Sequence, residues 1–469
     1  MKASRLHLRA LLCTALLAAG THLTLAADAA PRPNIVFLLA DDLGYADVGF
    51  MGSKDMRTPN VDTLAKGGAI LAAHYVQPVC SPTRAALMTG RYATHTGVYT
   101  IVRPHAKWGL PLPERTLANA LKEAGYETAI TGKWHLGEFE RTYLPTSRGF
   151  DHQHGLYFGM IDYFTHIRDG THDWHHDDVE LKEEGYSTHL IAREACRLIK
   201  ERNQAKPLFL YVPFNGVHSP MQAPESYLQP YAALKPNRQK LAGMLAAVDE
   251  AIGQIVAALD AAGMRENTLI VFSSDNGGPN PVALSDNGPL RAGKGTIYEG
   301  GVRVCACVNW PGHIPTGVTI NEPMHAVDWF PTLVKLAGGK VEAKLPLDGR
   351  DVWPMLTQSA KSPHDAILCV QSPTRAAVRM GDWKLLMNAS EQNSEEASDD
   401  KPKKGKGAGR KADAAGVALY NLATDIGEKT DLAAQEPERV AAMRAKLQEL
   451  LQNAAPEGQL GAEPAKKAK

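Results

Sequence analysis

The sequence predicts an α/β fold in which helices flank a large, mostly parallel sheet, followed by a small C-terminal α+β subdomain with an antiparallel sheet. The runs 34–40 and 268–274 have continuously apolar centres, at 35–40 and 269–272, which is typical of strands buried on both faces of a parallel sheet. Amphipathic helical patterns separate such runs, and this alternation favours a sheet covered on both sides. From about Asp365 the apolar runs become shorter, which indicates a second unit.

The N-terminal segment 1–27 reads as a cleavable secretory signal. Its basic residues Lys2, Arg5 and Arg9 precede an apolar run from Ala10 to Ala19, and small residues end the segment. The apolar run is too short for a membrane helix, and we expect no later membrane span. The sequence therefore predicts an exported protein, periplasmic or extracellular, with no membrane span.

The balance of charged residues and the number of cysteines argue against two classes of protein. The chain has 51 basic (Lys, Arg) and 51 acidic (Asp, Glu) residues, so no overall attraction to nucleic acid follows and anion binding has to be local. Besides Cys13 in the signal, five cysteines remain, an odd and sparse set that argues against a disulfide framework. Cys305 and Cys307 lie two apart in a strand-like run, so packing is the favoured role for both. Any pairing of Cys196, Cys305, Cys307 and Cys369 stays open.

We place the main N-terminal domain at residues 31–364. Four apolar runs in it are expected to be buried strands, at 34–40, 128–131, 208–212 and 268–274. Helices are expected between them at 60–66, 81–88, 116–124, 188–201 and 238–262.

Polar side chains follow each of these strands. In open α/β sheets ligands bind at the carboxyl ends of the strands, so the four segments are expected to meet in one crevice. Oxygen ligands of this kind suit Ca²⁺ or Mg²⁺ better than Zn²⁺, although a lone Asp after a strand often only caps the next turn. The residues concerned are Asp41, Asp42, Lys133, His135, Asn215, His218, Asp275 and Asn276.

Cys80 stands directly before a proline-started, Ala-rich helical turn. Pro82 suits the first turn of a helix, so Cys80 is expected just outside a helix N-terminus, where negative charge is favoured. Arg84 adds a cation with a fork of donors. A buried cysteine at an ordinary cap is the alternative.

The pattern Cys80-Ser81-Pro82-Thr83-Arg84 is Cys-x-Pro-x-Arg, and it resembles the signature of the formylglycine-dependent sulfatases, a branch of the alkaline phosphatase superfamily. The likeness extends from about Pro33 to about Leu451. The phrases at 132–137, 299–303 and 347–349 look most like arylsulfatase B, an N-acetylgalactosamine-4-sulfatase.

The resemblance implies that Cys80 is oxidised to formylglycine (3-oxoalanine) by a formylglycine-generating or sulfatase-maturing enzyme. The hydrated aldehyde would carry the nucleophilic hydroxyl. A bound Ca²⁺, with Mg²⁺ as the second choice, would be held by Asp41, Asp42, residue 80, Asp275 and Asn276.

The same resemblance assigns roles to the basic residues. His218 would protonate the leaving oxygen, while Lys133 and Lys294 would stabilise charge on the sulfate. His135 would take the proton of the second hydroxyl so that sulfate leaves, and Arg84 would steady the nucleophile.

Two variable loops are expected to contact substrate. Arg103, His105 and Trp108 in 99–108 join Lys133, His218 and Lys294 as candidate substrate-binding residues, and loop 151–178 adds aromatic and histidine side chains. We expect no second metal in the run 172–178, because consecutive loop residues point in different directions.

The sequence therefore predicts a secreted sulfatase that acts on a sulfated carbohydrate, with sulfated N-acetylgalactosamine as one candidate. A phosphoric or phosphonic ester hydrolase of the same superfamily, or a non-catalytic protein that binds sulfated glycans, are the alternatives.

The C-terminal subdomain is placed at 365–453. Strands are expected at 366–371, 376–380 and 383–387, and a helix at 437–452. The segment 389–416 is rich in Ser, Glu and Asp and then in Lys and Gly, which predicts a disordered insertion. The tail 454–469 is expected to be disordered as well.

Overall fold

The computed structural model describes residues 32–279, 285–342, 344–391 and 416–456. The predicted signal 1–27 lies outside these residues, as do most of the predicted insertion 389–416 and most of the tail 454–469. Strands β18 and β19 flank the insertion, and Asn388 N–H donates to Gly416 O at 2.9 Å where the two strands separate.

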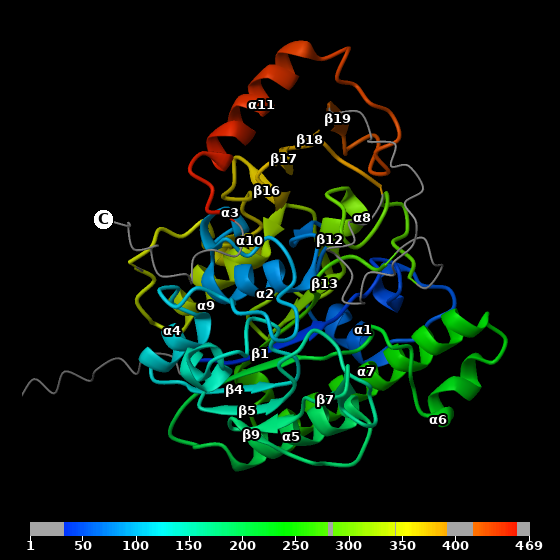
Figure 1. Cartoon of the computed structure of the whole chain (residues 1–469), viewed down its shortest axis with the longest axis vertical. Coiled ribbons are helices and arrows are strands. Elements are labelled where there is room, and N and C mark those ends of the chain that lie inside the picture. The colour runs from blue at the N-terminus through cyan, green and yellow to red at the C-terminus, as the bar shows by residue number, and fades with distance from the viewer. Residues whose placement is uncertain (1–31, 280–284, 343, 392–415, 457–469) are drawn as a thin grey trace, which may run out of the picture. The chain divides into compact units, whose positions relative to one another are not determined.

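A ten-stranded sheet forms the centre of the protein, in the order β14-β2-β13-β11-β1-β10-β4-β5-β8-β9 (Figure 1). Strands β11, β1, β10, β4 and β5 run parallel, while β13 pairs antiparallel with β11 and β8 antiparallel with β5. The predicted α/β class is confirmed, with a sheet that is mixed at its edges. The strands are β1 (Asn34–Ala40), β2 (Ala69–Leu71), β4 (Glu127–Thr131), β5 (His152–Gly155), β8 (His175–His176), β9 (Val179–Glu180), β10 (Leu208–Pro213), β11 (Thr268–Ser274), β13 (Ala306–Asn309) and β14 (Val318–Ile320).

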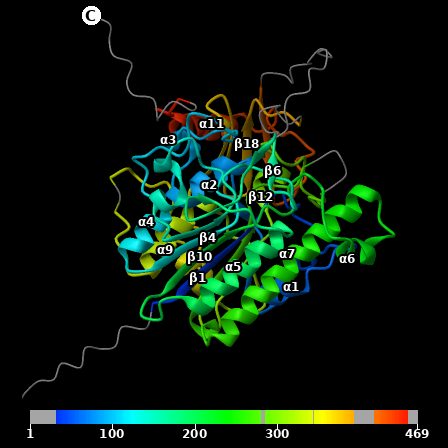
Figure 2. The ribbon, with the colours of Figure 1, turned by 60° about the horizontal axis from the view of Figure 1, so that its bottom comes forward.

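Helices cover both faces of this sheet, as Figure 2 shows. Because side chains alternate along a strand, β1 sends Val36 and Leu38 into one apolar cluster and Ile35 and Phe37 into another. The first cluster includes residues of α1, α5 and α7, and the second includes residues of α2, α4 and α9. The helices are α1 (Pro59–Lys66), α2 (Cys80–Thr89), α3 (Ala93–Thr96), α4 (Leu117–Glu123), α5 (Ser187–Glu201), α6 (Glu225–Leu228), α7 (Pro236–Ala261), α8 (Glu299–Val302), α9 (Trp329–Leu336), α10 (Trp353–Gln358) and α11 (Pro437–Leu451).

Helix α7 is long and apolar enough to cross a membrane by length and composition, which the sequence analysis did not expect. However, 61% of its most apolar window is buried against the rest of the protein. Core helices of soluble proteins meet the same two criteria, so this finding is weak evidence for a span.

The C-terminal part contains a four-stranded antiparallel sheet, β16-β17-β18-β19, against which α11 packs. The expected strands correspond to β16 (Ile367–Ser372), β17 (Arg375–Met380) and β18 (Trp383–Met387), and β19 (Val417–Asn421) completes the sheet. Two smaller sheets pair β12 (Arg303–Val304) and β15 (Met324–His325) with β3 (His74–Tyr75), and β6 (Ile167–Arg168) with β7 (Thr171–His172).

Helix α2 is buried along its whole length, and Val79 is its N-cap. Cys80 is thus the first helical residue rather than a residue just outside the helix. Pro82 is tolerated two positions later because the first four N–H groups of a helix have no intrahelical acceptor, so the N–H that proline lacks is not missed.

Candidate active site

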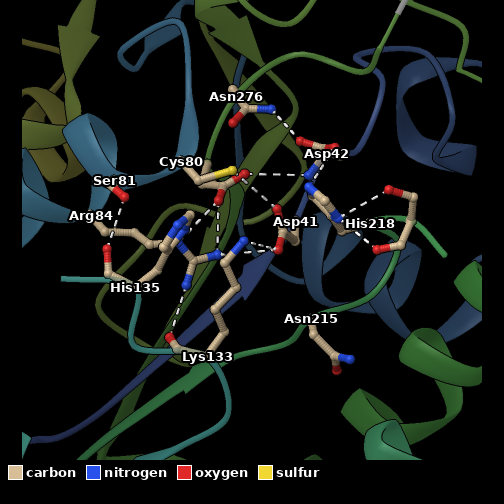
Figure 3. A network of polar contacts seen from close by, with 12 residues as sticks. Asp41, Asp42, Cys80, Ser81, Arg84, Lys133, His135, Asn215, His218 and Asn276 are labelled. Atoms are coloured by element: carbon tan, nitrogen blue, oxygen red, sulfur yellow. Dashed lines mark hydrogen bonds and ion pairs between the residues drawn. The ribbon is translucent and has the colours of Figure 1, made fainter. Parts of the chain in front are cut away.

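The carboxyl ends of β1 and β11 bring four oxygen-bearing side chains together. These strands are parallel neighbours with Ala40 opposite Ser274, so Asp41 and Asp42 follow one strand end where Asp275 and Asn276 follow the other. Asn276 Nδ2 donates to Asp42 Oδ1 at 2.7 Å, and Asp42 N–H donates to Asp275 Oδ1 at 3.3 Å (Figure 3). All four side chains are buried.

Helix α2 directs Cys80 at this group. The Cys80 thiol donates to Asp41 Oδ1 at 3.5 Å and is fully buried. Ligand atoms of Asp41, Asp42, Cys80 and His218 all lie within 4.8 Å of one another. Burial, followed by the negative charge of Asp275, raises the pKa of the Cys80 thiol well above its ordinary value.

Three buried cations surround the carboxylates. Lys133 Nζ donates to Asp41 Oδ2 at 2.6 Å, and Lys294 Nζ donates to Asp42 Oδ2 at 2.9 Å. Arg84 donates from Nη2 and Nε to Asp275 Oδ2 at 2.8 and 3.1 Å, and from Nη1 to the Lys133 carbonyl at 2.9 Å. The guanidinium of Arg84 therefore holds the carboxylates themselves.

The two adjacent aspartates differ in their electrostatics. Burial, reinforced by Asp275, raises the pKa of Asp41 despite the nearby cations. Burial also acts to raise the pKa of Asp42, but Lys294 and His218 outweigh it and the net pKa is lowered. Asp42 is therefore the more readily ionised of the two carboxyl groups.

The donor atoms fit a hard divalent cation. Among the described residues, the buried Asn276 Oδ1 has no hydrogen-bond partner, which is costly for an amide oxygen unless another group satisfies it. Carboxylate and amide oxygens are the ligands that Ca²⁺ and Mg²⁺ prefer. Asp41, Asp42, Asp275 and Asn276, together with residue 80, can hold such an ion.

Hydrogen bonds to neighbouring backbone and side-chain groups hold the two histidines of the site, His135 and His218, in place. His135 N–H donates to Tyr157 O at 3.0 Å, and its carbonyl accepts from Ser81 Oγ at 2.8 Å, which ties it to the residue after Cys80. His218 Nδ1 donates to Ser219 O at 2.7 Å, so its Nε2 faces Lys294 Nζ at 3.1 Å as an acceptor.

Other predicted residues lie further from this group. Asn215, after β10, donates to Ser187 Oγ at 3.0 Å instead. His105 is exposed, its ring meets Phe158 edge-on at 5.5 Å, and its N–H donates to Glu138 Oε1 at 2.6 Å. Trp108 is half-buried against the apolar cluster of α2 and α4, and Arg103 is half-buried.

Sequence reasoning missed Glu138 and Ser81. Burial raises the pKa of Glu138 to about 7, and the residue lies three positions after His135. Ser81 stands inside the Cys-x-Pro-x-Arg pattern, and its place next to Cys80 could have identified it as a residue of the site.

Comparison with known proteins agrees with this geometry. The sulfatase family model matches residues 33–339. Mouse arylsulfatase J is 40% identical over 362 residues, which cover 75% of this chain but only 60% of that protein. Human arylsulfatase A is 36% identical over 383 residues, covering 75% of this chain and 74% of its own length.

A solved structure is also similar to this chain over nearly its whole length. Ps i-CgsB in complex with k-i-k-neocarrahexaose is 34% identical with a TM-score of 0.82, covering 92% of this chain and 95% of that one. The similar relatives include arylsulfatases J and A and an N-acetylgalactosamine-6-sulfatase, so the likeness to arylsulfatase B is only approximate. The chain belongs to the sulfatase family, whose members are sulfuric ester hydrolases.

Proposed function

We propose that this chain hydrolyses sulfate esters on a carbohydrate, with a nucleophile derived from Cys80. The observation that carries the proposal is the position of Cys80, fully buried at the start of α2 with its thiol 3.5 Å from Asp41 Oδ1. The same residue opens an intact Cys-x-Pro-x-Arg pattern.

In this proposal Cys80 is converted to formylglycine by a maturing enzyme. Formylglycine, once hydrated, supplies one hydroxyl to attack sulfur and a second whose proton can be removed so that sulfate leaves. The Cys80 thiol lacks the second hydroxyl, so the unmodified chain could at most bind a sulfated glycan.

Each of the surrounding residues has its own role in the proposed reaction. Lys133 and Lys294 hold the sulfate oxygens and offset the charge that develops on them. His218, when it is protonated at Nε2 as well as at Nδ1, gives a proton to the leaving oxygen, and His135 removes the proton of the second hydroxyl. The contacts of Arg84 favour a positioning role, since it holds Asp275 and the Lys133 carbonyl.

The ion we propose is Ca²⁺, with Mg²⁺ as the second choice. It would be held by Asp41, Asp42, Asp275, Asn276 and residue 80, and it supplies positive charge that lowers the cost of a negative oxygen beside it. Asn276 Oδ1, buried and without a partner in the described structure, supports this assignment.

A carbohydrate substrate is supported by the relatives. Ps i-CgsB was solved with an oligosaccharide, k-i-k-neocarrahexaose, and it covers nearly the whole chain. Sulfated N-acetylgalactosamine is one candidate, and Arg103, His105 and Trp108 are the proposed sugar-side residues. We also propose export to the periplasm or the extracellular space through the signal at 1–27.

Mass spectrometry and sulfate release test the proposal together. In protein made with a maturing enzyme, the peptide carrying residue 80 is expected about 18 Da below its thiol form, because CHO replaces CH₂SH. The same protein should release sulfate from sulfated monosaccharides, and Cys80→Ala should abolish that release.

Cys196→Ser, at a half-buried cysteine on α5, is the matched control and should keep activity. Phosphate or phosphonate esters cleaved much faster than every sulfate ester would replace the proposed reaction with the alternative one.

A further inference from the structure

A second group of metal-ligating side chains lies at the edge of the ten-stranded sheet, apart from the residues that follow β1 and β11. It joins three elements: His154 on β5, His176 on β8 and Glu194 on α5. One ligand atom of each lies within 4.8 Å of the other two. Figure 1 shows β5 and β9 beside α5 at this end of the molecule.

The two imidazoles face each other through the same nitrogen. His154 and His176 are opposite residues of the antiparallel pair β5 and β8, and their Nδ1 atoms are 3.3 Å apart. Two nitrogens bound to one tetrahedral Zn²⁺ at its usual bond length are about 3.3–3.4 Å apart. The observed separation suits two ligands of one zinc ion, and it also suits a hydrogen bond between the two rings.

The far sides of both rings face carboxylates. His154 Nε2 lies 3.3 Å from Glu183 Oε2, and His176 Nε2 lies 3.7 Å from Asp177 Oδ2. When each ring carries its proton at Nε2, on the side of these carboxylates, its Nδ1 is left as a lone pair, which is the tautomer that a metal ion between the rings requires. Two lone pairs then point at each other and need a cation, a proton or a metal ion, between them.

Glu194 supplies a third ligand and part of the charge. Its side chain is nearly buried, and Arg197 donates to both of its oxygens, at 2.6 and 2.8 Å. These bonds orient the carboxylate, and each oxygen retains a second lone pair.

We infer that His154, His176 and Glu194 bind one Zn²⁺ ion. The ligand set is two imidazoles and one carboxylate, borderline donors that suit zinc better than Ca²⁺. His154 is buried whereas His176 is 42% exposed on its side chain, so the ion has a path from solvent and water can complete its coordination.

The ion has a structural consequence for the neighbouring loop. It links β8 to β5 and α5, and the preceding residue of β8, His175, stacks on Tyr157 with ring centroids 4.2 Å apart. Tyr157 in turn accepts the His135 N–H. The zinc site therefore holds in place the hairpin that packs behind His135, whatever the reaction catalysed there.

Zinc binding measured by competition with a chromogenic chelator tests the inference, on the full-length protein in excess Ca²⁺. The wild-type protein should bind one Zn²⁺ tightly. His176→Ala should weaken binding by about 100-fold, and Glu183→Gln by about 10-fold, because second-shell carboxylates contribute that much to metal affinity. His313→Ala removes an exposed histidine elsewhere and should leave binding unchanged.

His176 is partly exposed, so its variant is expected to fold, and an unchanged unfolding midpoint without zinc checks this. Slower amide exchange in residues 171–180 on adding Zn²⁺, in wild type but not in His176→Ala, is the second expected result. Zinc affinity equal in wild type and His176→Ala, or no tight zinc binding by the wild type, would overturn the inference and leave a proton shared between the two rings.

Discussion

At the scale of single residues, Lys294 shows how much depends on one buried cation. Its Nζ lies 2.9 Å from Asp42 Oδ2 and 3.1 Å from His218 Nε2, so it contacts both a proposed metal ligand and the proposed acid. In the sequence Lys294 stands between two glycines, Gly293 and Gly295.

We predict that Lys294→Ala lowers kcat/KM for sulfate ester hydrolysis by about 100- to 1000-fold, the usual cost of removing one donor that stabilises developing charge. Steady-state kinetics on a sulfated monosaccharide measure this. Lys200→Ala, at an exposed lysine near the end of α5, is the control and should retain full activity. A loss below about threefold in Lys294→Ala would contradict the assigned role.

Some residues could be found from the sequence because a local pattern carries them. Asp41, Asp42, Asp275 and Asn276 follow the two most apolar runs, and strand ends are where such side chains gather. The pairing of His154 with His176 could not be found in this way. The sequence analysis expected no second metal in the run 172–178, but the second histidine of the proposed pair comes from another strand, and only tertiary structure brings the two together.

At the scale of elements, the turn after β4 positions Lys133. Gly132 has φ +130°, and a Cβ there would lie 2.0 Å from the Pro213 carbonyl oxygen. Gly132 N–H donates to His154 O and Lys133 N–H donates to Pro213 O, both at 2.7 Å. The chain therefore leaves β4 between its two neighbouring strands, and that close approach requires glycine.

Gly132→Ala is expected to lower the free energy of unfolding by about 2–4 kcal/mol, from backbone strain and overpacking together. Chemical denaturation of the purified variants gives this value. Gly338→Ala also has positive φ, at +69°, but its Cβ would meet nothing within 4 Å, so it should cost only about 1–2 kcal/mol. Equal losses in the two variants would show that the contact with Pro213 is unimportant.

Long buried strands and amphipathic helices were predictable, since each carries its own periodicity. The expected runs 34–40 and 268–274 are β1 and β11 with the same bounds. Strands of two or three residues, such as β3, β8 and β9, are too short to show a period and are defined only by their partners. Strand β19 was missed because it follows a long insertion that separates it from β18.

At the scale of the whole molecule, a buried charge network joins the C-terminal sheet to the rest of the chain. Lys384 on β18 donates to Glu299 Oε1 of α8 at 2.8 Å and lies 3.0 Å from Glu428 Oε1. Glu299 N–H donates to Glu428 Oε2 at 2.7 Å. Two carboxylates thus share this lysine, and Arg379 and Arg303 lie nearby.

Burial, with the charge of Glu299, raises the pKa of Glu428 to about 7, although Lys384 opposes the shift. The folded chain therefore binds a proton here that the unfolded chain releases above its ordinary glutamate pKa. The resulting stabilisation is complete below that ordinary pKa and is lost as pH rises through about 7.

We predict that the free energy of unfolding falls between about pH 5 and pH 8, and that Glu428→Gln makes this decline smaller. Urea denaturation at a series of pH values measures it. Glu184→Gln, at an exposed carboxylate, should reproduce the wild-type pH dependence. A decline unchanged in Glu428→Gln would assign the effect to another group.

The order of strands in the large sheet could not be predicted from local pattern, because nothing in β10 itself says that it lies between β1 and β4. Its apolar run shows only that it is central. The general architecture was predicted from the resemblance to sulfatases. The antiparallel pairs at the edges of the sheet were seen only in the structure.

The burial of α2 limits the time at which another enzyme can reach Cys80. Every residue of this helix is enclosed, and Cys80 has no exposed surface. If Cys80 is converted to formylglycine as proposed, the enzyme that oxidises its sulfur can reach it only while the polypeptide is still open. Protein that folds before meeting that enzyme would then stay inactive, however well it is formed.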